Sequence, residues 1–253
     1  MSSKPLNRQS LKSLFKNGKR PNETNFASLI DSTLNQVDDG ISRNIEEGLI
    51  LSPKGKDAVR LISFKDKIQN RLSKWGIDYV QKGSEGLAFV EPVSVDKEAT
   101  RLFLAKGGNL GVGTEKPRTS LEVNGILSAE SRIGTYRLSK VPADGKWHTI
   151  LSNLNGYSAF EIVAQVGKPK SGRHALLHAH ALSTYGKSRS RIRKTQARYK
   201  WWWWDKINLR WTGDTYNYQL QIKTRSNYGS DQDIKYYITK LWDDDIMTLF
   251  NDL

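Results

Sequence analysis

The chain has 253 residues, with 40 Lys and Arg against 26 Asp and Glu and a formal net charge of +14. The absence of cysteine excludes a disulfide-stapled scaffold, a cysteine-based zinc site and a thiol nucleophile. No apolar run is long enough to predict a membrane-spanning helix, and the N-terminus predicts no classical signal peptide. Hydrophobic residues make up 37%, which is enough for a core but low for one compact globule.

The positive charge is concentrated in the second half of the chain. Residues 101–253 carry 24 basic and 13 acidic side chains, and residues 168–200 carry ten basic and no acidic ones. Residues 226–253 reverse the sign, with six Asp against two Lys. A basic block before an acidic tail indicates either charge-complementary contacts, within the chain or between copies, or solvated surface.

Residues 1–40 have a helical pattern. A short amphipathic helix is predicted up to Asn17 and Gly18, and a second helix is predicted after Pro21. The apolar side chains of the second helix follow one another at steps of three or four, at Phe26, Leu29, Ile30, Leu34 and Val37. A short helical hairpin cannot bury such a stripe by itself, so we expect these residues to attach the chain to another protein.

Residues 41–130 predict short strands separated by many turns. Residues 63–76 also fit a helix, because four apolar side chains recur there at steps of three or four. So many turns with so little core per strand suit a fibrous, intertwined oligomer in which each chain takes core from its neighbours.

Residues 131–253 predict an antiparallel β domain. Strand-like runs lie between turn residues at 149–151, 159–164, 175–182, 207–211, 218–222 and 234–242. Strands at this spacing favour a β-sandwich, jelly-roll-like, of about a hundred residues. The expected fold class is therefore mainly β, with an N-terminal helical hairpin, a short β-fibre segment and a C-terminal sandwich knob.

Residues 109–125 contain a distinctive glycine-rich pattern: NLGVGT, then Pro117, then LEVNG. This pattern resembles the NLGIGT..P...LEVNG element of phage tail fibres and related bacterial fibres. Residues 11–32 are similar to the opening of fibre-like proteins in Bacteroidetes phages and in the tail-like contractile injection systems of the same bacteria.

The resemblance implies a homotrimer in a virion or an extracellular tail-like particle, assembled in the bacterial cytoplasm. It implies that the N-terminal helices bind particle proteins. Gly111 and Gly113 would let three chains approach closely, and an ordinary hairpin in a monomer is the alternative. The residues expected to form the trimer contacts are Leu110, Gly111, Val112, Gly113, Pro117, Leu121 and Val123.

A basic and aromatic block is the candidate receptor site. Its arginines share one face if the segment is a strand, and four consecutive tryptophans follow: Arg189, Arg191 and Arg193, then Trp201, Trp202, Trp203 and Trp204. Trp side chains stack on sugar rings, and Arg binds acidic glycans or phosphates in bidentate fashion. Packing in the sandwich core or an interface is a second interpretation of the quartet. Nucleic acid is a third, without support from an RNP, KH or zinc-finger pattern.

His178 and His180 form a His-x-His pair that is the candidate metal site. A pair of this kind around a threefold axis offers six imidazoles, which suits an octahedral transition metal. An exposed or partly buried polar strand face is the alternative. We expect no enzyme and no cofactor, because the sequence has no Gly-x-Ser-x-Gly elbow, Walker loop or His-Glu-x-x-His. Glu161 is the only acidic residue between Asp144 and Asp205, which leaves few candidates for a glycosidase carboxylate pair.

The sequence therefore predicts a structural fibre or appendage subunit of a phage tail or tail-like injection particle. Its C-terminal knob either binds a cell-surface receptor or glycan or serves as structure alone. The alternative is a stand-alone β-sandwich module that binds carbohydrate or nucleic acid. Oligomeric state separates the two, because the fibre requires a stable trimer and the module a monomer.

Overall fold

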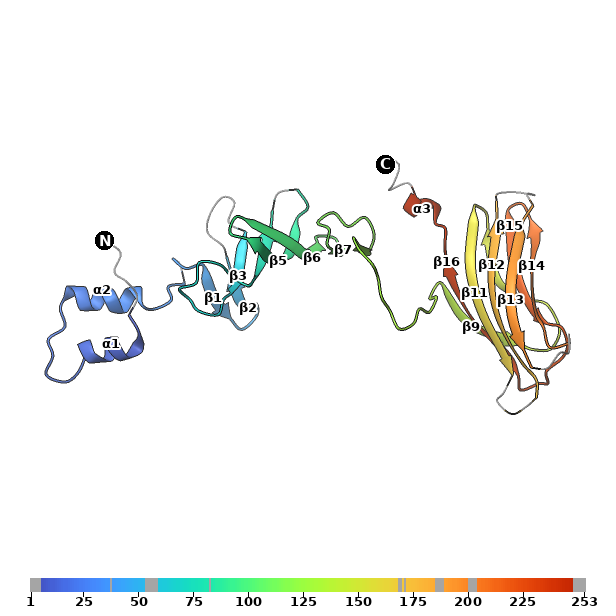
Figure 1. Cartoon of the computed structure of the whole chain (residues 1–253), viewed down its shortest axis with the longest axis horizontal. Helices are drawn as coiled ribbons and strands as arrows, with labels where there is room; N and C mark the ends of the chain where they lie inside the picture. Colours follow the sequence, from blue (N-terminus) through green and yellow to red (C-terminus); the bar gives the residue numbers. More distant parts are fainter. Residues whose placement is uncertain are drawn as a thin grey trace. The chain divides into compact units, whose positions relative to one another are not determined.

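The chain is mainly β, as predicted, with 49% of its residues in strands and 9% in helices. The computed structural model describes residues 6–36, 38–52, 59–81, 83–167, 170, 172–184, 189–199 and 204–247. Contacts divide the chain into two compact units, Met1–Leu127 and Ser128–Leu253 (Figure 1). None of the described helices is long and apolar enough to cross a membrane.

Two short helices open the first unit. Helix α1 spans Arg8–Leu14, and α2 spans Glu23–Asp31 and begins with a reciprocal capping box at Asn22. The helices contact each other through Phe15 and Phe26, whose ring centroids are 5.5 Å apart in an edge-to-face arrangement. Neither helix contains a fully buried residue, and Phe26 and Ile30 of α2 remain exposed.

A small hairpin and a six-stranded sheet follow. The hairpin consists of β1 (Ile41–Asn44) and β2 (Gly48–Leu51). The strands of the larger sheet lie side by side in chain order: β3 (Arg60–Phe64), β4 (Trp75–Val80), β5 (Gly86–Ser94), β6 (Lys97–Ala105), β7 (Leu110–Val112) and β8 (Leu121–Val123). The alternative helix over residues 63–76 is wrong, because β3 ends and β4 begins inside it. Its apolar residues recur with helical spacing, but the segment instead forms parts of two strands that pair with each other.

One face of the six-stranded sheet carries the buried residues of the first unit. Ala88, Val90 and Phe103 form a small buried cluster there. The side chain of Arg60 lies against Gly76 on this face. It forms ion pairs with Asp78 and with Glu98 of β6.

The opposite face carries two rows of apolar side chains that are not buried. Register partners on neighbouring strands place their side chains side by side on one face. We call these side chains the apolar rows: Ile62, Ile77, Phe89, Leu102, Val112 and Val123 in the first, and Tyr79, Leu87, Leu104, Leu110 and Leu121 in the second. Leu102, Leu104 and Leu121 are 40%, 46% and 53% exposed. No described segment of the first unit buries this face.

The second unit contains two antiparallel sheets. One has five strands in the order β13-β12-β11-β16-β9, and the other has three in the order β10-β15-β14. Their bounds are β9 (Arg137–Pro142), β10 (His148–Leu154), β11 (Ser158–Gly167), β12 (His174–Ser183), β13 (Arg191–Arg198), β14 (Ile207–Asp214), β15 (Asn217–Thr224) and β16 (Asp233–Lys240); a short helix, α3 (Asp244–Met247), follows. All six predicted runs lie largely in strands, and β9 and β13 were not among them.

Both sheets of the second unit contribute to one hydrophobic core. Its largest members are at most 2% exposed and come from both layers: Phe160, Ile162, Leu177 and Ile238 from the five-stranded sheet, and Ile150, Ile207, Leu220 and Ile222 from the other. Along β11 and β12, buried positions alternate with half-buried or exposed ones. Full burial of each such side chain stabilises the fold by about 1.5–3 kcal/mol. The second unit therefore has a core of its own.

Candidate functional site

The outward side chains of β11, β12 and β13 form a continuous surface, which we call the outer face. The register pairs Ala159 with Leu182 and Leu182 with Arg191, so these three side chains form one row. The next two rows are Glu161, His180 and Arg193, then Val163, His178 and Thr195. Because the other side of each strand packs into the core, the sheet holds these side chains toward solvent in a fixed order.

An open hollow of about 600 Å³ lies at one end of the outer face, where β11 begins and β12 ends. Its apolar and aromatic lining includes Tyr157, Leu182 and Trp242, which are 58%, 51% and 38% exposed. Arg189 and Arg191 line the same hollow. No carboxylate of the described residues forms an ion pair with either arginine. The hollow therefore combines flat apolar surface with two cationic groups suited to an anionic ligand.

The structure brings together only part of the predicted receptor site. Arg193 lies in the next row, beside His180, and does not line the hollow. Trp204 is 47% exposed and precedes β14. The other three tryptophans of the quartet, 201–203, lie outside the described residues. Tyr157 and Trp242 were missed because they are distant in sequence from the basic block, and only the strand pairing brings them to it.

The predicted metal pair lies on the outer face with an acidic partner. The rings of His178 and His180 are 5.0 Å apart between centroids. Glu161, the register partner of His180, lies with its Oε1 3.0 Å from His178 Nε2. The potential ligand atoms of these three residues all lie within 4.8 Å of one another. Arg132 Nη2 binds the other oxygen of Glu161, Oε2, at 2.5 Å.

His174 does not join this cluster, although it lies on the same face of the strand. Its ring is 4.9 Å from that of Tyr199, and its Nδ1 is buried without a hydrogen-bond partner. The sequence signal for Glu161 was its isolation as the only acidic residue in a basic stretch. Its proximity to the histidines depends on the β11–β12 register, which the sequence does not reveal.

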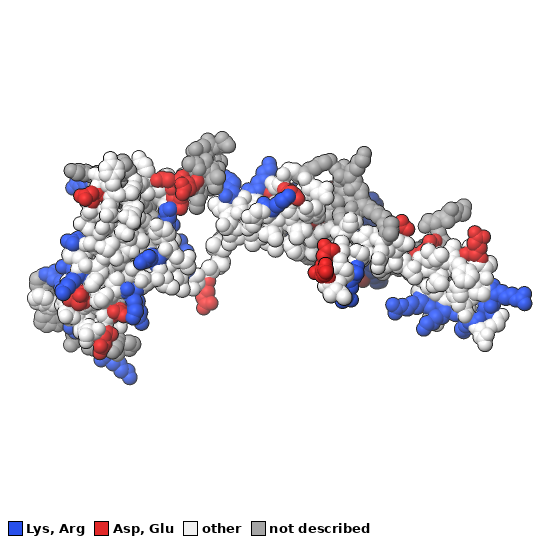
Figure 2. Space-filling model, turned by 180° about the vertical axis from the view of Figure 1, so that it is seen from behind, with Lys and Arg blue, Asp and Glu red and all other residues white. Residues whose placement is uncertain are grey.

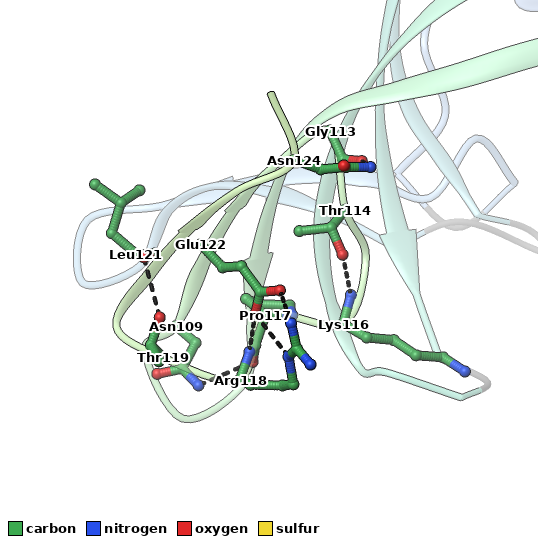
Figure 3. A network of polar contacts seen from close by, with 10 residues as sticks. All are labelled: Asn109, Gly113, Thr114, Lys116, Pro117, Arg118, Thr119, Leu121, Glu122 and Asn124. Carbon is green, nitrogen blue, oxygen red and sulfur yellow. Dashed lines mark hydrogen bonds and ion pairs between the residues drawn. The ribbon is translucent and has the colours of Figure 1, made fainter. Parts of the chain in front are cut away.

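The predicted trimerisation residues lie in β7, β8 and the loop between them. Leu110, Val112, Leu121 and Val123 all belong to the apolar rows, and Gly111, Gly113 and Pro117 do not. Polar contacts close the loop (Figure 3): Asn109 Nδ2 donates a hydrogen bond to the carbonyl of Pro117 at 3.1 Å, and Asn124 Nδ2 donates one to the carbonyl of Gly113 at 3.3 Å.

The same loop holds an ion pair between Arg118 and Glu122, with Nη2 2.7 Å from Oε1 (Figure 3). The backbone N–H of Arg118 also donates to Glu122 at 2.7 Å. Hydrogen bonds from the Arg118 side chain and then from its backbone lower the pKa of Glu122 below its ordinary value of 4.5.

The glycines of this element have roles within one chain. A Cβ on Gly111 would lie 2.2 Å from the carbonyl oxygen of Thr114, so the loop can fold over β7 only if this residue has no side chain. Gly113 has a φ of +70°, a conformation that favours glycine. These constraints explain both glycines without an approach of neighbouring chains.

The predicted attachment residues differ in their surroundings. Phe26 and Ile30 are 51% and 65% exposed, and Leu29 is half-buried. Leu34 is exposed but lies beyond the end of α2, so the prediction that it continues the helical stripe is wrong. Side-chain hydrogen bonds at the helix end, such as Thr33 Oγ1 to the carbonyl of Ile30, compete with continued helix. Val37 lies outside the described residues.

The two ends of the chain differ in the charge seen on one side. Figure 2 shows Lys and Arg around the lower edge of the helical segment, on the right, with Asp and Glu above them. On the side of the second unit drawn there, the two signs are interspersed. The described Lys and Arg of the second unit therefore do not gather into one basic patch on that side.

Comparison with protein-family models and with curated proteins gives no match. No protein-family model matches the sequence, and no curated protein matches it. The function must therefore be argued from the residues and their arrangement.

Proposed function

We propose that the chain is a structural fibre or appendage subunit of a phage tail or a tail-like contractile injection particle, assembled in the bacterial cytoplasm as a homotrimer. The observation that carries the proposal is the pair of apolar rows on the six-stranded sheet. A stable domain normally buries the apolar face of a sheet against a second layer. Large exposed apolar patches on soluble proteins mark interaction surfaces.

We propose that other copies of the same chain bury the apolar rows. The rows contain no charged side chain, and the first continues across six strands and the second across five, so a neighbouring copy would meet a largely apolar surface. Leu110, Val112, Leu121 and Val123, which lie in these rows, also belong to the element that resembles phage fibres. The resemblance to phage fibres is the reason for proposing three chains. The exposure of the apolar rows is the reason for proposing that another protein surface buries them.

The remaining parts have proposed roles in the same particle. The two N-terminal helices form an attachment hairpin, in which Phe26 and Ile30 bind a particle protein. Their exposure supports this role, because no described residue covers them fully. The second unit is a jelly-roll-like sandwich knob. Its own core supports a role that does not depend on contact with the fibre segment.

The knob is proposed to bind an anionic cell-surface glycan in the hollow of the outer face. Tyr157 and Trp242 offer flat surfaces on which a sugar ring stacks, and Arg189 and Arg191 offer donors to a carboxylate or sulfate. The hollow also favours the alternative function, a stand-alone carbohydrate-binding module. No nucleic-acid ligand is proposed.

Sedimentation velocity of the full chain and of residues 131–253 tests the fibre proposal. The full chain is expected to sediment as a trimer at micromolar concentration, and the fragment as a smaller species, because it lacks the apolar rows. A monomeric full chain would contradict the proposal and favour the stand-alone module.

Binding of the full chain to a panel of acidic and neutral glycans tests the role of the hollow. Arg191→Ser is expected to weaken binding to acidic glycans, and Arg193→Ser, a matched change on the same strand outside the hollow, to leave it nearly unchanged. Equal losses in the two variants would show a general charge effect, and absence of binding at low salt would remove the receptor role.

A further inference from the structure

We propose that Glu161, His178 and His180 bind one divalent transition-metal ion per chain on the outer face, and that Zn²⁺ is the ion this ligand set suits best. Two imidazoles and a carboxylate are a ligand combination that zinc accepts, with water in the fourth position. Imidazole ligands disfavour Ca²⁺ and Mg²⁺, which prefer oxygen. The proposal does not depend on the fibre function.

The geometry of the three side chains is close to that of a bound ion. Ligands about 2.0–2.1 Å from a tetrahedral zinc lie about 3.3 Å apart. His178 Nε2 and Glu161 Oε1 are already 3.0 Å apart, and His180 completes a cluster within 4.8 Å. Both histidines are exposed, so small rotations of their rings can close the remaining distance. An ion would replace the direct contact between His178 and Glu161.

The sheet supplies a rigid support for these ligands. His178 and His180 are alternate residues of β12 and therefore point to the same side. Glu161 lies directly opposite His180 in a β11–β12 pairing that continues without a register shift from Ser158 to Gly167. The ligand backbones are thus already ordered, and little entropy is lost when the ion binds.

The surrounding charge limits the affinity of the site. Arg132 binds Glu161 Oε2, and Arg193 is the register neighbour of His180 on β13. Both cations repel a divalent ion. Arg132 leaves Oε1 available, however, and its side chain is 68% exposed, so it can move away from the site. We therefore expect binding weaker than at a buried zinc site, and stronger binding when Arg132 is neutralised.

The number of ions per chain distinguishes this site from the one first predicted from the sequence. Six imidazoles around a threefold axis would hold one ion for three chains. Three ligands from one chain hold one ion for each chain, whatever the oligomeric state. A plain hydrogen-bonded polar face would hold none.

The experiment is a titration of the untagged full chain with Zn²⁺ by calorimetry and with Co²⁺ by visible absorption. We expect one Zn²⁺ per chain and cobalt d–d bands of the intensity that low-symmetry, four- or five-coordinate sites give. His180→Ala and Glu161→Gln should each weaken binding at least about tenfold, because each removes a ligand. Arg132→Gln should strengthen binding, a change that a general loss of structure would not produce.

His148→Ala is the matched control. His148 Nε2 contacts Asp144 Oδ1 at 2.8 Å, which repeats the histidine–carboxylate contact without a second imidazole nearby. This variant should bind the ions as the unaltered chain does. The proposal is overturned by a stoichiometry of one ion per three chains, by absence of saturable binding, or by equal losses in the His148 and His180 variants.

Discussion

The large sheets of the two units differ in how far their apolar faces are buried. In the second unit, the inward face of the five-stranded sheet lies on a three-stranded sheet, and core side chains such as Ile162 and Leu220 are fully buried. In the first unit, the six-stranded sheet has a small buried cluster on one face, and the apolar rows on the other face have no described cover.

This difference is the basis of the proposal that copies of the chain associate through the first unit. The core of the second unit is complete within one chain, so its stability should not vary with protein concentration. If copies associate as proposed, the first unit gains its missing burial from the interface, and its stability should rise with concentration. In the proposed fibre, that interface would supply core that a chain with 37% hydrophobic residues does not form by itself.

The largest effect is expected when the same negative charge is placed on the surface of each unit, which tests whether copies associate through the first unit alone. Leu102→Asp puts an unpaired carboxylate in the apolar rows and is expected to abolish the trimer. Leu138→Asp is the matched change, at a leucine of the second unit that is 69% exposed, and should leave assembly intact. Size-exclusion chromatography with light scattering measures both.

A trimeric Leu102 variant would show that the apolar rows are not the interface. Dissociation of the Leu138 variant would place an interface in the second unit, contrary to the comparison.

A smaller effect is expected at the glycines of the β7–β8 element. Gly111→Ala brings a Cβ within 2.2 Å of the Thr114 carbonyl oxygen, and the loop must move to admit it. We expect it to destabilise the first unit by about 1–3 kcal/mol. Gly125→Ala, where a Cβ meets nothing within 4 Å, serves as the control and should have little effect.

Thermal unfolding at fixed protein concentration compares the two variants. Equal stability would show that the close approach between β7 and the loop carries no constraint.

The smallest effect concerns pH. Arg118 lowers the pKa of Glu122, so this contact stabilises the fold above the ordinary carboxyl pKa of 4.5 and is lost as the pH falls through the lower folded value. Glu122→Gln should therefore be less stable than the unaltered chain at neutral pH, and the difference should shrink in acid. Glu46→Gln, at an exposed carboxylate of the first unit, is the control.

Melting temperatures between pH 3 and pH 7, an interval of about four units around the carboxyl pKa, give this comparison. A gap between the Glu122 variant and the unaltered chain that stays constant in acid would rule out the titration of Glu122 as its cause.

The sequence predicted best those elements whose pattern lies within one short segment of the chain. Runs of strand-forming residues between turn signals, at 159–164 and 175–182, predicted β11 and β12. The predicted stripe of the second helix ran on through Leu34 and Val37, but α2 ends at Asp31, where the hydroxyl of Thr33 donates to the carbonyl of Ile30 and competes with continued helix. The strand β9 has no strong alternation of its own, and it was missed.

The apolar rows and the histidine cluster could not be predicted from single segments, because both depend on how strands pair. Leu110 and Leu121 were predicted to form contacts between chains, but their common row with Tyr79, Leu87 and Leu104 depends on the registers of the pairings that join five strands. The partnership of Glu161 with two histidines likewise depends on register. A shift of one residue would have moved Glu161 to the core side of the sheet.

The chain-order arrangement of the six-stranded sheet has a consequence for the rate of assembly. Each strand pairs with the strand next in sequence, so the contacts are short-range, and short-range contacts favour fast folding. A fast-folding single layer then presents its apolar rows before another copy has covered them. In the proposed homotrimer, encounter between copies becomes the slow step, and the half-time of assembly should fall as the concentration of newly made chains rises.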